Sequence, residues 1–267
     1  MTTLADIFAH AANLTRANRA FALVHLVRVR GSSPGKSGFL LLVTPEAALG
    51  TIGGGDAERQ MIAQARAALR EGRSRTVHFE LSTRPGNLVK SLCGGTNEVF
   101  IEVFMPRPCL LLLGGGHVSW AVGRLCEMLE YPYVVLDDRR EFARAEHFGG
   151  ALDVVRARGA RYFARKELPA FSHVVGLGYD AEFDLDGLVP ALKRMPAHVQ
   201  FGAIGSKAKF ARMTALARKR GISAKLWARV KCPVGMSIGA QTPAEIAVAI
   251  MADVVASLPG RKSHGWR

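Results

Sequence analysis

The sequence lacks the features that mark membrane, secreted and zinc-binding proteins. It has no uninterrupted apolar run of the roughly 18 residues that a membrane helix needs, so no segment is expected to span a bilayer. The first 20 residues lack a basic start, an apolar core and a small-residue cleavage site. They are expected to form an amphipathic helix instead of a signal peptide. These absences favour a soluble, cytoplasmic protein.

Cysteine is scarce and scattered. The four cysteines, Cys93, Cys109, Cys126 and Cys232, form no Cys-x-x-Cys pair, and their spacing is unlike that of a zinc site. Cys109 and Cys126 sit in apolar runs and are predicted to be core thiols. Cys93 and Cys232 stand beside glycine or proline in loops, where a thiolate could be exposed. All four are expected to be free in a reducing compartment.

Acidic residues are missing from one stretch of a strongly basic chain. The formal net charge is +14, and residues 206–231 hold nine lysines or arginines and no aspartate or glutamate. Such a positive field attracts an anion, which could be nucleic acid, an acidic protein face or a phosphorylated ligand. No nucleic-acid reader motif is visible, so nucleic acid is not expected as a partner. The alternative is a solvated helix face that binds nothing.

The first half of the chain predicts a small α/β domain. Hydrophobic residues make up 49% of the 267 residues, enough for one large or two small domains. The pattern predicts helices over 3–19 and 56–71 and strands over 21–30, 39–44, 75–82 and 97–106. The Met-Pro-Arg-Pro segment at 105–108 is the predicted boundary. We therefore expect an N-terminal domain over 1–106.

After residue 107 short apolar strands alternate with helices, which is typical of a doubly wound parallel sheet. Strands are predicted over 109–114, 133–138, 172–178 and 199–205, and helices over 117–129, 140–147, 186–194 and 206–220. A final helix to about 257 begins with Thr242 as N-cap, Pro243 at its first position and Glu245 completing a capping box. We expect a C-terminal Rossmann-like domain over 107–260 and a flexible tail over 261–267.

The segment CLLLLGGGHVSW carries much of a dinucleotide-binding fingerprint. Gly114 would permit the tight turn, and Gly116 would let the backbone approach a phosphate at the helix N-terminus. His117 lies at the mouth of this turn, and Asp137 or Asp138 stands at the distance of a ribose-binding acid. Ser119 replaces the third glycine, which predicts looser helix–strand packing. The alternative is a Rossmann-like turn that binds no dinucleotide.

A second anion site is predicted at AIGSKAKFAR, where Gly205 and Ser206 open a helix that carries Lys207, Lys209 and Arg212. Positive side chains at a helix N-terminus oppose the helix dipole, and a bound phosphate would offset that repulsion. Charge tolerated by solvent is the alternative. A further glycine triplet, Gly53 to Gly55 in GTIGGGDAE, precedes the helix predicted over 56–71.

Six motifs, in order along residues 21–255, resemble those of the XdhC/CoxI family, the accessory proteins of molybdenum hydroxylases such as xanthine dehydrogenase. They are GSSPGKSG, GTIGGGDAE, the Cys93-Gly94-Gly95 segment, LGGGHVS with DDR, IGSKAK, and PVGMSIGAQTPAEIAVAI. The resemblance implies a chaperone that binds molybdenum cofactor (molybdopterin), protects it for sulfuration and delivers it to an apo molybdenum hydroxylase. A cysteine desulfurase is an implied further partner, and a homodimer is compatible with this function.

The resemblance also implies the residues that would contact the cofactor. They are Gly53, Gly54, Gly55, Asp56, Cys93, Gly94, Gly95, Gly114, Gly116, His117, Asp137, Ser206 and Lys207, with Cys93 as the candidate metal ligand. The two glycine triplets are expected to face one cleft between domains. Two departures stand out: Asp56 replaces a cysteine that many relatives carry, and GLGYDAEFD replaces a Thr-His-containing motif.

Two other functions stay open on the residues alone. An NAD(P)- or nucleotide-dependent oxidoreductase could use the Rossmann half, although no placed acid/base pair accompanies it. An adaptor could instead dock an acidic partner on the basic helix. The cofactor carrier is the prediction tested below, and a carrier would bind and deliver without catalytic turnover.

Overall fold

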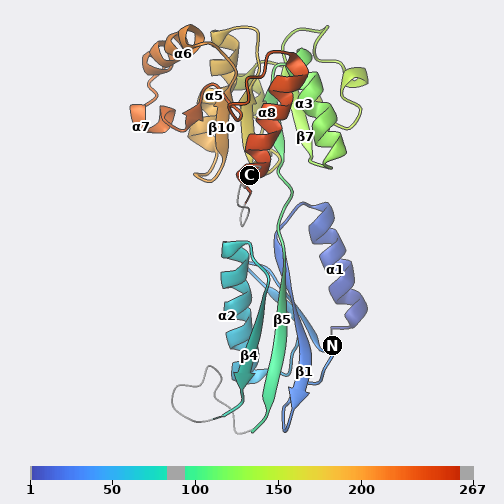
Figure 1. The fold of residues 1–267 in the computed structure, drawn as a ribbon. Helices are drawn as coiled ribbons and strands as arrows, with labels where there is room; N and C mark the ends of the chain where they lie inside the picture. Colours follow the sequence, from blue (N-terminus) through green and yellow to red (C-terminus); the bar gives the residue numbers. More distant parts are fainter. Residues whose placement is uncertain (1, 83–93, 259–267) are drawn as a thin grey trace. The chain divides into compact units, whose positions relative to one another are not determined.

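The computed structural model describes residues 2–82 and 94–258 (Figure 1). The chain divides into two compact units, Met1–Pro106 and Arg107–Arg267, called unit 1 and unit 2 below. The tail predicted over 261–267 and the cysteine at position 93 lie outside the described residues. In the described part of the chain, no helix is both long and apolar enough to cross a bilayer.

Unit 1 is an antiparallel five-stranded sheet with one helix on each face. The strands, in the order β3-β2-β1-β5-β4, are β1 (Phe21–Arg30), β2 (Leu40–Val43), β3 (Ala48–Gly50), β4 (Arg75–Glu80) and β5 (Thr96–Phe104). Side chains alternate along β1: Val24 and Leu26 pack with α2 (Gly55–Glu71), whereas Phe21 and Leu23 pack with α1 (Leu4–Arg16). Figure 1 shows the two helices on opposite sides of these strands.

Unit 2 is a six-stranded parallel sheet in the order β11-β10-β9-β6-β7-β8. Its strands are β6 (Leu110–Leu113), β7 (Tyr133–Asp137), β8 (Asp153–Arg156), β9 (His173–Gly176), β10 (Gln200–Ala203) and β11 (Val230–Lys231). Successive strands run outward from β6 in one direction and from β9 in the other, so the order reverses between β6 and β9. Ligands of such sheets bind at this switch point, beyond the carboxyl ends of the strands.

Helices cover both faces of the unit 2 sheet. One face packs against α3 (His117–Met128) and α8 (Pro243–Ala256). The other packs against α4 (Gly159–Phe163), α5 (Ala181–Arg194), α6 (Lys207–Lys219) and α7 (Ala224–Trp227). A 3-10 turn, η1 (Ala145–His147), lies between β7 and β8. The predicted fold class, a small α/β domain followed by a Rossmann-like doubly wound sheet, is confirmed.

Several predicted boundaries were wrong for local reasons. Helix α1 ends at Arg16, not residue 19, because Asn18 adopts a left-handed conformation with φ of 51°. Helix α5 begins at Ala181, not residue 186, because the Asp180 side chain caps it by accepting from Phe183 N. The helix predicted over 140–147 is only the turn η1. The short elements β3, β8, α4, α7 and β11 were not predicted.

Candidate functional site

The turn after β6 is built from three glycines with different surroundings. Gly114 has φ of +111°, and a Cβ there would lie 2.7 Å from the carbonyl oxygen of Leu177. A Cβ on Gly115 would lie 2.2 Å from the carbonyl oxygen of Phe142. At Gly116, in contrast, a Cβ would meet nothing within 4 Å. Gly114 and Gly115 therefore allow the turn to pack, whereas Gly116 leaves the backbone open to a ligand.

Helix α3 starts from this turn without a side-chain cap. Its N-cap is Gly116, no side chain bonds its first amides, and its first turn contains no acid. The three other long helices of the described part of unit 2 are capped, α5 by Asp180, α6 by Ser206 and α8 by Thr242. Uncapped amides at a helix N-terminus attract an anion such as phosphate. Among these helices α3 is the one whose first amides have no side-chain cap.

A cavity of about 340 Å³ adjoins the N-terminus of α3. Its walls come from the turn, from α3 and from the segment after β7: Gly115, Gly116, His117, Trp120, Glu141, Phe142 and His147. Trp120 is 50% exposed. Aromatic walls beside an anion-attracting helix end suit a flat, phosphorylated molecule. Of the predicted residues, Gly116 and His117 line this cavity and Gly114 does not, whereas Trp120 and Phe142 were not predicted.

Asp137, one of the two candidate ribose-binding acids, is bonded by donors of the protein itself. Its side chain is fully buried, and its oxygens accept from Gly115 N at 2.8 Å and from Arg139 N, Nε and Nη2 at 2.9, 3.0 and 2.9 Å. Burial by itself would raise the pKa of Asp137, but the bonds from Arg139 and Gly115 prevail and lower it. Asp137 is an ionised support beneath the glycine turn.

Ser119 likewise has a structural role. It is buried and donates to the carbonyl oxygen of Gly114 at 2.5 Å, which fixes the turn to α3. Close packing between α3 and β7 is provided instead by Gly123, where a Cβ would lie 3.1 Å from the Tyr133 hydroxyl oxygen. Gly123, one helical turn after Ser119, thus provides the close helix–strand contact that the third glycine of the fingerprint would provide.

The switch-point turn after β9 is held by a buried ion pair. Asp184 is fully buried, accepts from Gly178 N at 2.8 Å and pairs with Lys209 Nζ at 2.6 Å, and Lys209 Nζ also donates to Gly178 O at 3.1 Å. Burial raises the pKa of Asp184, and the Lys209 ammonium opposes that shift. The pair fixes Gly178, next to Gly114, from both its amide and its carbonyl.

The same contacts weaken the argument for an anion site at α6. The Ser206 hydroxyl accepts from Lys209 N and so caps the helix. Lys209 is paired with Asp184, and Arg212 lies 3.6 Å from Glu182. Asp184 and Glu182 therefore neutralise the positive charge in the first turns of α6. The sequence had predicted that a bound phosphate would do so. Lys207 is exposed on the first turn.

In unit 1 the predicted glycine motifs meet at one end of the sheet. A Cβ on Gly35, in the loop after β1, would lie 2.2 Å from Ile52 O, and one on Gly53 would lie 2.6 Å from Gly35 N. A Cβ on Gly95 would lie 2.3 Å from Ser32 O. Three loops that are distant in sequence thus pack backbone against backbone. Gly54, Gly55 and Gly94 face open space.

An acid of the protein itself occupies the amides of the unit 1 turn. Glu58 Oε2 accepts from Thr51 Oγ1 at 2.5 Å, Ile52 N at 3.1 Å and Gly54 N at 3.2 Å. Asp56 pairs with Arg59 across one helical turn. With two acids in the first turn of α2, this turn repels an anion where the α3 turn attracts one. The glutamate three residues after the triplet was the sequence signal for this difference.

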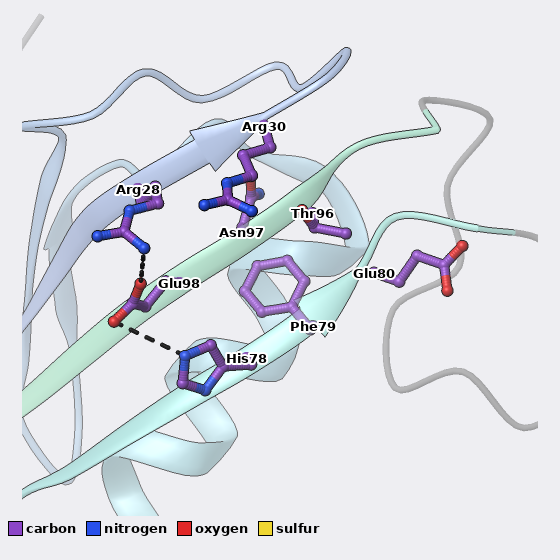
Figure 2. A pocket seen from close by; sticks show the side chains of 8 residues that line it. All are labelled: Arg28, Arg30, His78, Phe79, Glu80, Thr96, Asn97 and Glu98. Carbon is purple, nitrogen blue, oxygen red and sulfur yellow. Dashed lines mark ion pairs between the residues drawn. The ribbon is translucent and has the colours of Figure 1, made fainter.

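Unit 1 also carries a surface hollow of about 360 Å³, shown in Figure 2, over the ends of β1, β4 and β5. Glu98 lies between two basic side chains, 3.5 Å from Arg28 Nη1 and 3.7 Å from His78 Nε2. Arg30 and Glu80 add one charge of each sign. Because its acids and bases offset one another, the hollow is a weaker anion trap than the uncapped end of α3.

The described cysteines differ in accessibility. Cys109 and Cys126 are buried, and burial raises the pKa of each thiol to about 12, which confirms them as unreactive core residues. Cys232 is half-buried, and burial raises its pKa as well, although Lys209 opposes the shift. Among the described residues no cluster of three histidines, cysteines or acids could hold a metal ion. The metal ligand predicted at Cys93 lies outside those residues.

Two family models match the chain. The model described as the XdhC Rossmann domain matches residues 110–254, and the model of the XdhC and CoxI family matches residues 14–80. The chain is 32% identical over 252 residues to the uncharacterized protein YqeB of Escherichia coli strain K12. That match covers 94% of this chain but 46% of YqeB, so the chain spans about half the length of this relative.

A solved structure shares the fold over both units. It is described as a xanthine dehydrogenase from Bacillus halodurans, and the match has a TM-score of 0.51 and 18% identity over 96% of each chain. At that identity the likeness concerns the arrangement of helices and strands alone.

Proposed function

The chain belongs to the XdhC and CoxI family, and we propose that it is an accessory protein that binds molybdenum cofactor and delivers it to an apo molybdenum hydroxylase in the cytoplasm. The cofactor is the cargo of this function, and the hydroxylase, of the xanthine dehydrogenase type, is the client. A cysteine desulfurase is the proposed source of sulfur for the cargo. The protein's own contribution is binding, shielding and release.

The observation that carries the proposal is the uncapped N-terminus of α3 beside an aromatic cavity. Molybdopterin is flat, carries one phosphate and is anionic. Its phosphate fits the amides at Gly116 and His117, because Gly116 is open and the first turn of α3 contains no acid. Its pterin ring fits the cavity between Trp120 and Phe142, whose volume of about 340 Å³ lies within the range of small-molecule sites.

The unit 1 turn has a different role in the proposal. Gly54 and Gly55 offer open backbone, but Glu58 occupies the nearby amides and Asp56 adds a second negative charge. An uncharged part of a ligand can approach there more easily than a phosphate can. Cys93, with Gly94 and Gly95 after it, stays the proposed thiol of this unit. Molybdenum bound to the pterin would supply the hydroxylase's redox centre after transfer.

Protein isolated without oxygen from a host that makes the cofactor tests the proposal. Oxidation of the bound fraction should release a fluorescent pterin, and mass spectrometry of metals should find molybdenum in proportion to it. Addition of an apo hydroxylase should transfer the pterin to that enzyme. Protein free of pterin under these conditions would contradict the proposed function.

A further inference from the structure

Asp137 has no capacity left for a ligand. An ionised carboxylate has about four acceptor positions, and four donors already occupy those of Asp137: Gly115 N and three nitrogens of Arg139. In dinucleotide-binding turns the acid at this place accepts a ribose hydroxyl. Here a neutral sugar diol would find no free acceptor on Asp137.

Arg139 is instead held in a fixed orientation. Its guanidinium carbon lies 3.8 Å from the centre of the Phe142 ring and 4.2 Å from that of the Tyr179 ring, so aromatic rings contact the group. Nε and Nη2 bond to Asp137, whereas Nη1 donates to none of the described residues. The side chain is 29% exposed. A planar guanidinium held in this way is well suited to binding an oxyanion through its edge.

Two contacts connect Arg139 with the proposed site. Phe142, which packs on Arg139, also forms a wall of the cavity beside α3. Asp137 bonds both Arg139 and Gly115 N, the middle amide of the glycine turn. Asp137 is the main acid acting on Arg139 and raises its pKa, Glu141 adds to that effect, and Asp138 lies 3.4 Å from Arg158. Arg139 therefore lies next to the cavity, with the Phe142 ring between its guanidinium and a ligand bound there.

We propose that Arg139 is a specificity-determining residue that binds a second anionic group of the unit 2 ligand. The site then favours molecules that carry an anion beyond the phosphate at α3 over molecules that end in a neutral diol. Among nucleotides, the preferred class is one with a phosphate on its ribose. This inference rests on the proposed function only in placing a first phosphate at the N-terminus of α3.

A matched pair of probes isolates the second anion. Adenosine 2′,5′-bisphosphate and 5′-AMP share the ring and the 5′-phosphate and differ in the 2′-phosphate alone. Isothermal titration calorimetry of the full chain should show the bisphosphate binding about tenfold more tightly or better, as expected for a charge-assisted contact to arginine. Arg139→Met should abolish the preference, and Arg139→Lys should keep part of it, because a lysine retains the charge without the planar edge.

The wild-type comparison needs no variant to fold, so a destabilised Arg139→Met cannot obscure the result. Equal affinities, a preference for 5′-AMP, or no binding of either probe would overturn the inference. So would a preference that survives Arg139→Met. Pterin retention is measured on separate samples. If the protein retains pterin but binds the two probes equally, the role of Arg139 alone is refuted. If it prefers the bisphosphate but holds no pterin, the proposed cargo alone is refuted.

Discussion

At the scale of single residues, two adjacent glycines of one motif differ in whether the protein leaves space for a side chain. Gly115 is enclosed by the backbone of the segment after β7, whereas Gly116 faces open space at the start of α3. The sequence identifies both as turn glycines, because strand, glycine run and helix follow one another. It could not distinguish them, since the distinction depends on Phe142, which lies 27 residues after Gly115 in the chain.

Gly115→Ala is expected to lower the free energy of unfolding by about 2–3 kcal/mol, since its Cβ would overlap a carbonyl oxygen and force the backbone to move. Gly116→Ala at the neighbouring position should lower that free energy by about 1 kcal/mol or less, the cost of replacing an N-cap glycine by alanine. Urea unfolding followed by circular dichroism measures both. Equal losses in the two variants would show that the turn is packed differently.

Asp137 and Glu58 illustrate why residue roles were only partly predictable. Both acids follow a glycine turn, and the spacing of Asp137 suggested ligand contact. Each proves to bond amides of its own turn, Asp137 at Gly115 and Glu58 at Ile52 and Gly54. Residue type and spacing bring a carboxylate to the turn, but the number of protein donors that reach it decides whether any acceptor remains.

At the scale of elements, strongly patterned segments were predictable and short ones were not. The capping box predicted at Thr242 and Glu245 is present, and α8 begins at Pro243. Strand β1 spans Phe21–Arg30 as the alternation indicated. Strands β8 and β11 lie at the two edges of the unit 2 sheet and each has a single buried residue, so neither shows the apolar run that indicated β6, β7, β9 and β10.

The end of helix α8 is joined to strand β9 by a buried histidine. His173 Nε2 lies 3.1 Å from Ser257 Oγ at the C-cap of α8, and Nδ1 lies 2.8 Å from Ser172 Oγ. Burial lowers the pKa of His173 from 6.5 to about 4. The folded state therefore holds this imidazole neutral through the range in which an unfolded chain takes up a proton.

This contact predicts a loss of stability in acid. Between pH 6.5 and about 4 the unfolded chain binds a proton at this histidine and the folded chain does not. The free energy of unfolding therefore decreases as the pH is lowered, and His173 contributes up to about 3 kcal/mol to that decrease. His173→Asn should unfold more easily at pH 7.5 but lose less between pH 7 and 5. Urea midpoints at several pH values measure this. A pH slope that is unchanged in the variant would contradict the assignment.

At the scale of the whole molecule, each unit has its own hydrophobic interior. Among the described residues, the clusters around Met61 and around Leu23 belong to unit 1, and those around Leu112 and around Leu185 belong to unit 2. A domain with its own core can unfold on its own. The two units should therefore respond separately to mutations in their cores.

Met61→Ala and Leu112→Ala remove fully buried side chains, one from each unit, at an expected cost of about 2–5 kcal/mol. Hydrogen exchange followed by mass spectrometry should show faster exchange in unit 1 for the first variant and in unit 2 for the second. Faster exchange throughout the chain in either variant would mean that the units unfold together.

The central claim is that the glycine turn before α3 receives the phosphate of a molybdopterin cargo. A Cβ at position 116 meets nothing within 4 Å, and the methyl groups of a valine there would lie where the cargo is proposed to approach. Gly149 is a matched control, because a Cβ there also meets nothing within 4 Å, and its neighbour Gly150 bonds Glu127 near the opposite end of α3.

The most direct test is the pterin content per chain of three proteins isolated together without oxygen: wild type, Gly116→Val and Gly149→Val. The account predicts that wild type and Gly149→Val retain pterin equally and that Gly116→Val, folded by circular dichroism, retains about a tenth or less, the loss expected when a phosphate contact of about 1.4 kcal/mol or more is removed. Equal pterin in all three proteins would contradict it.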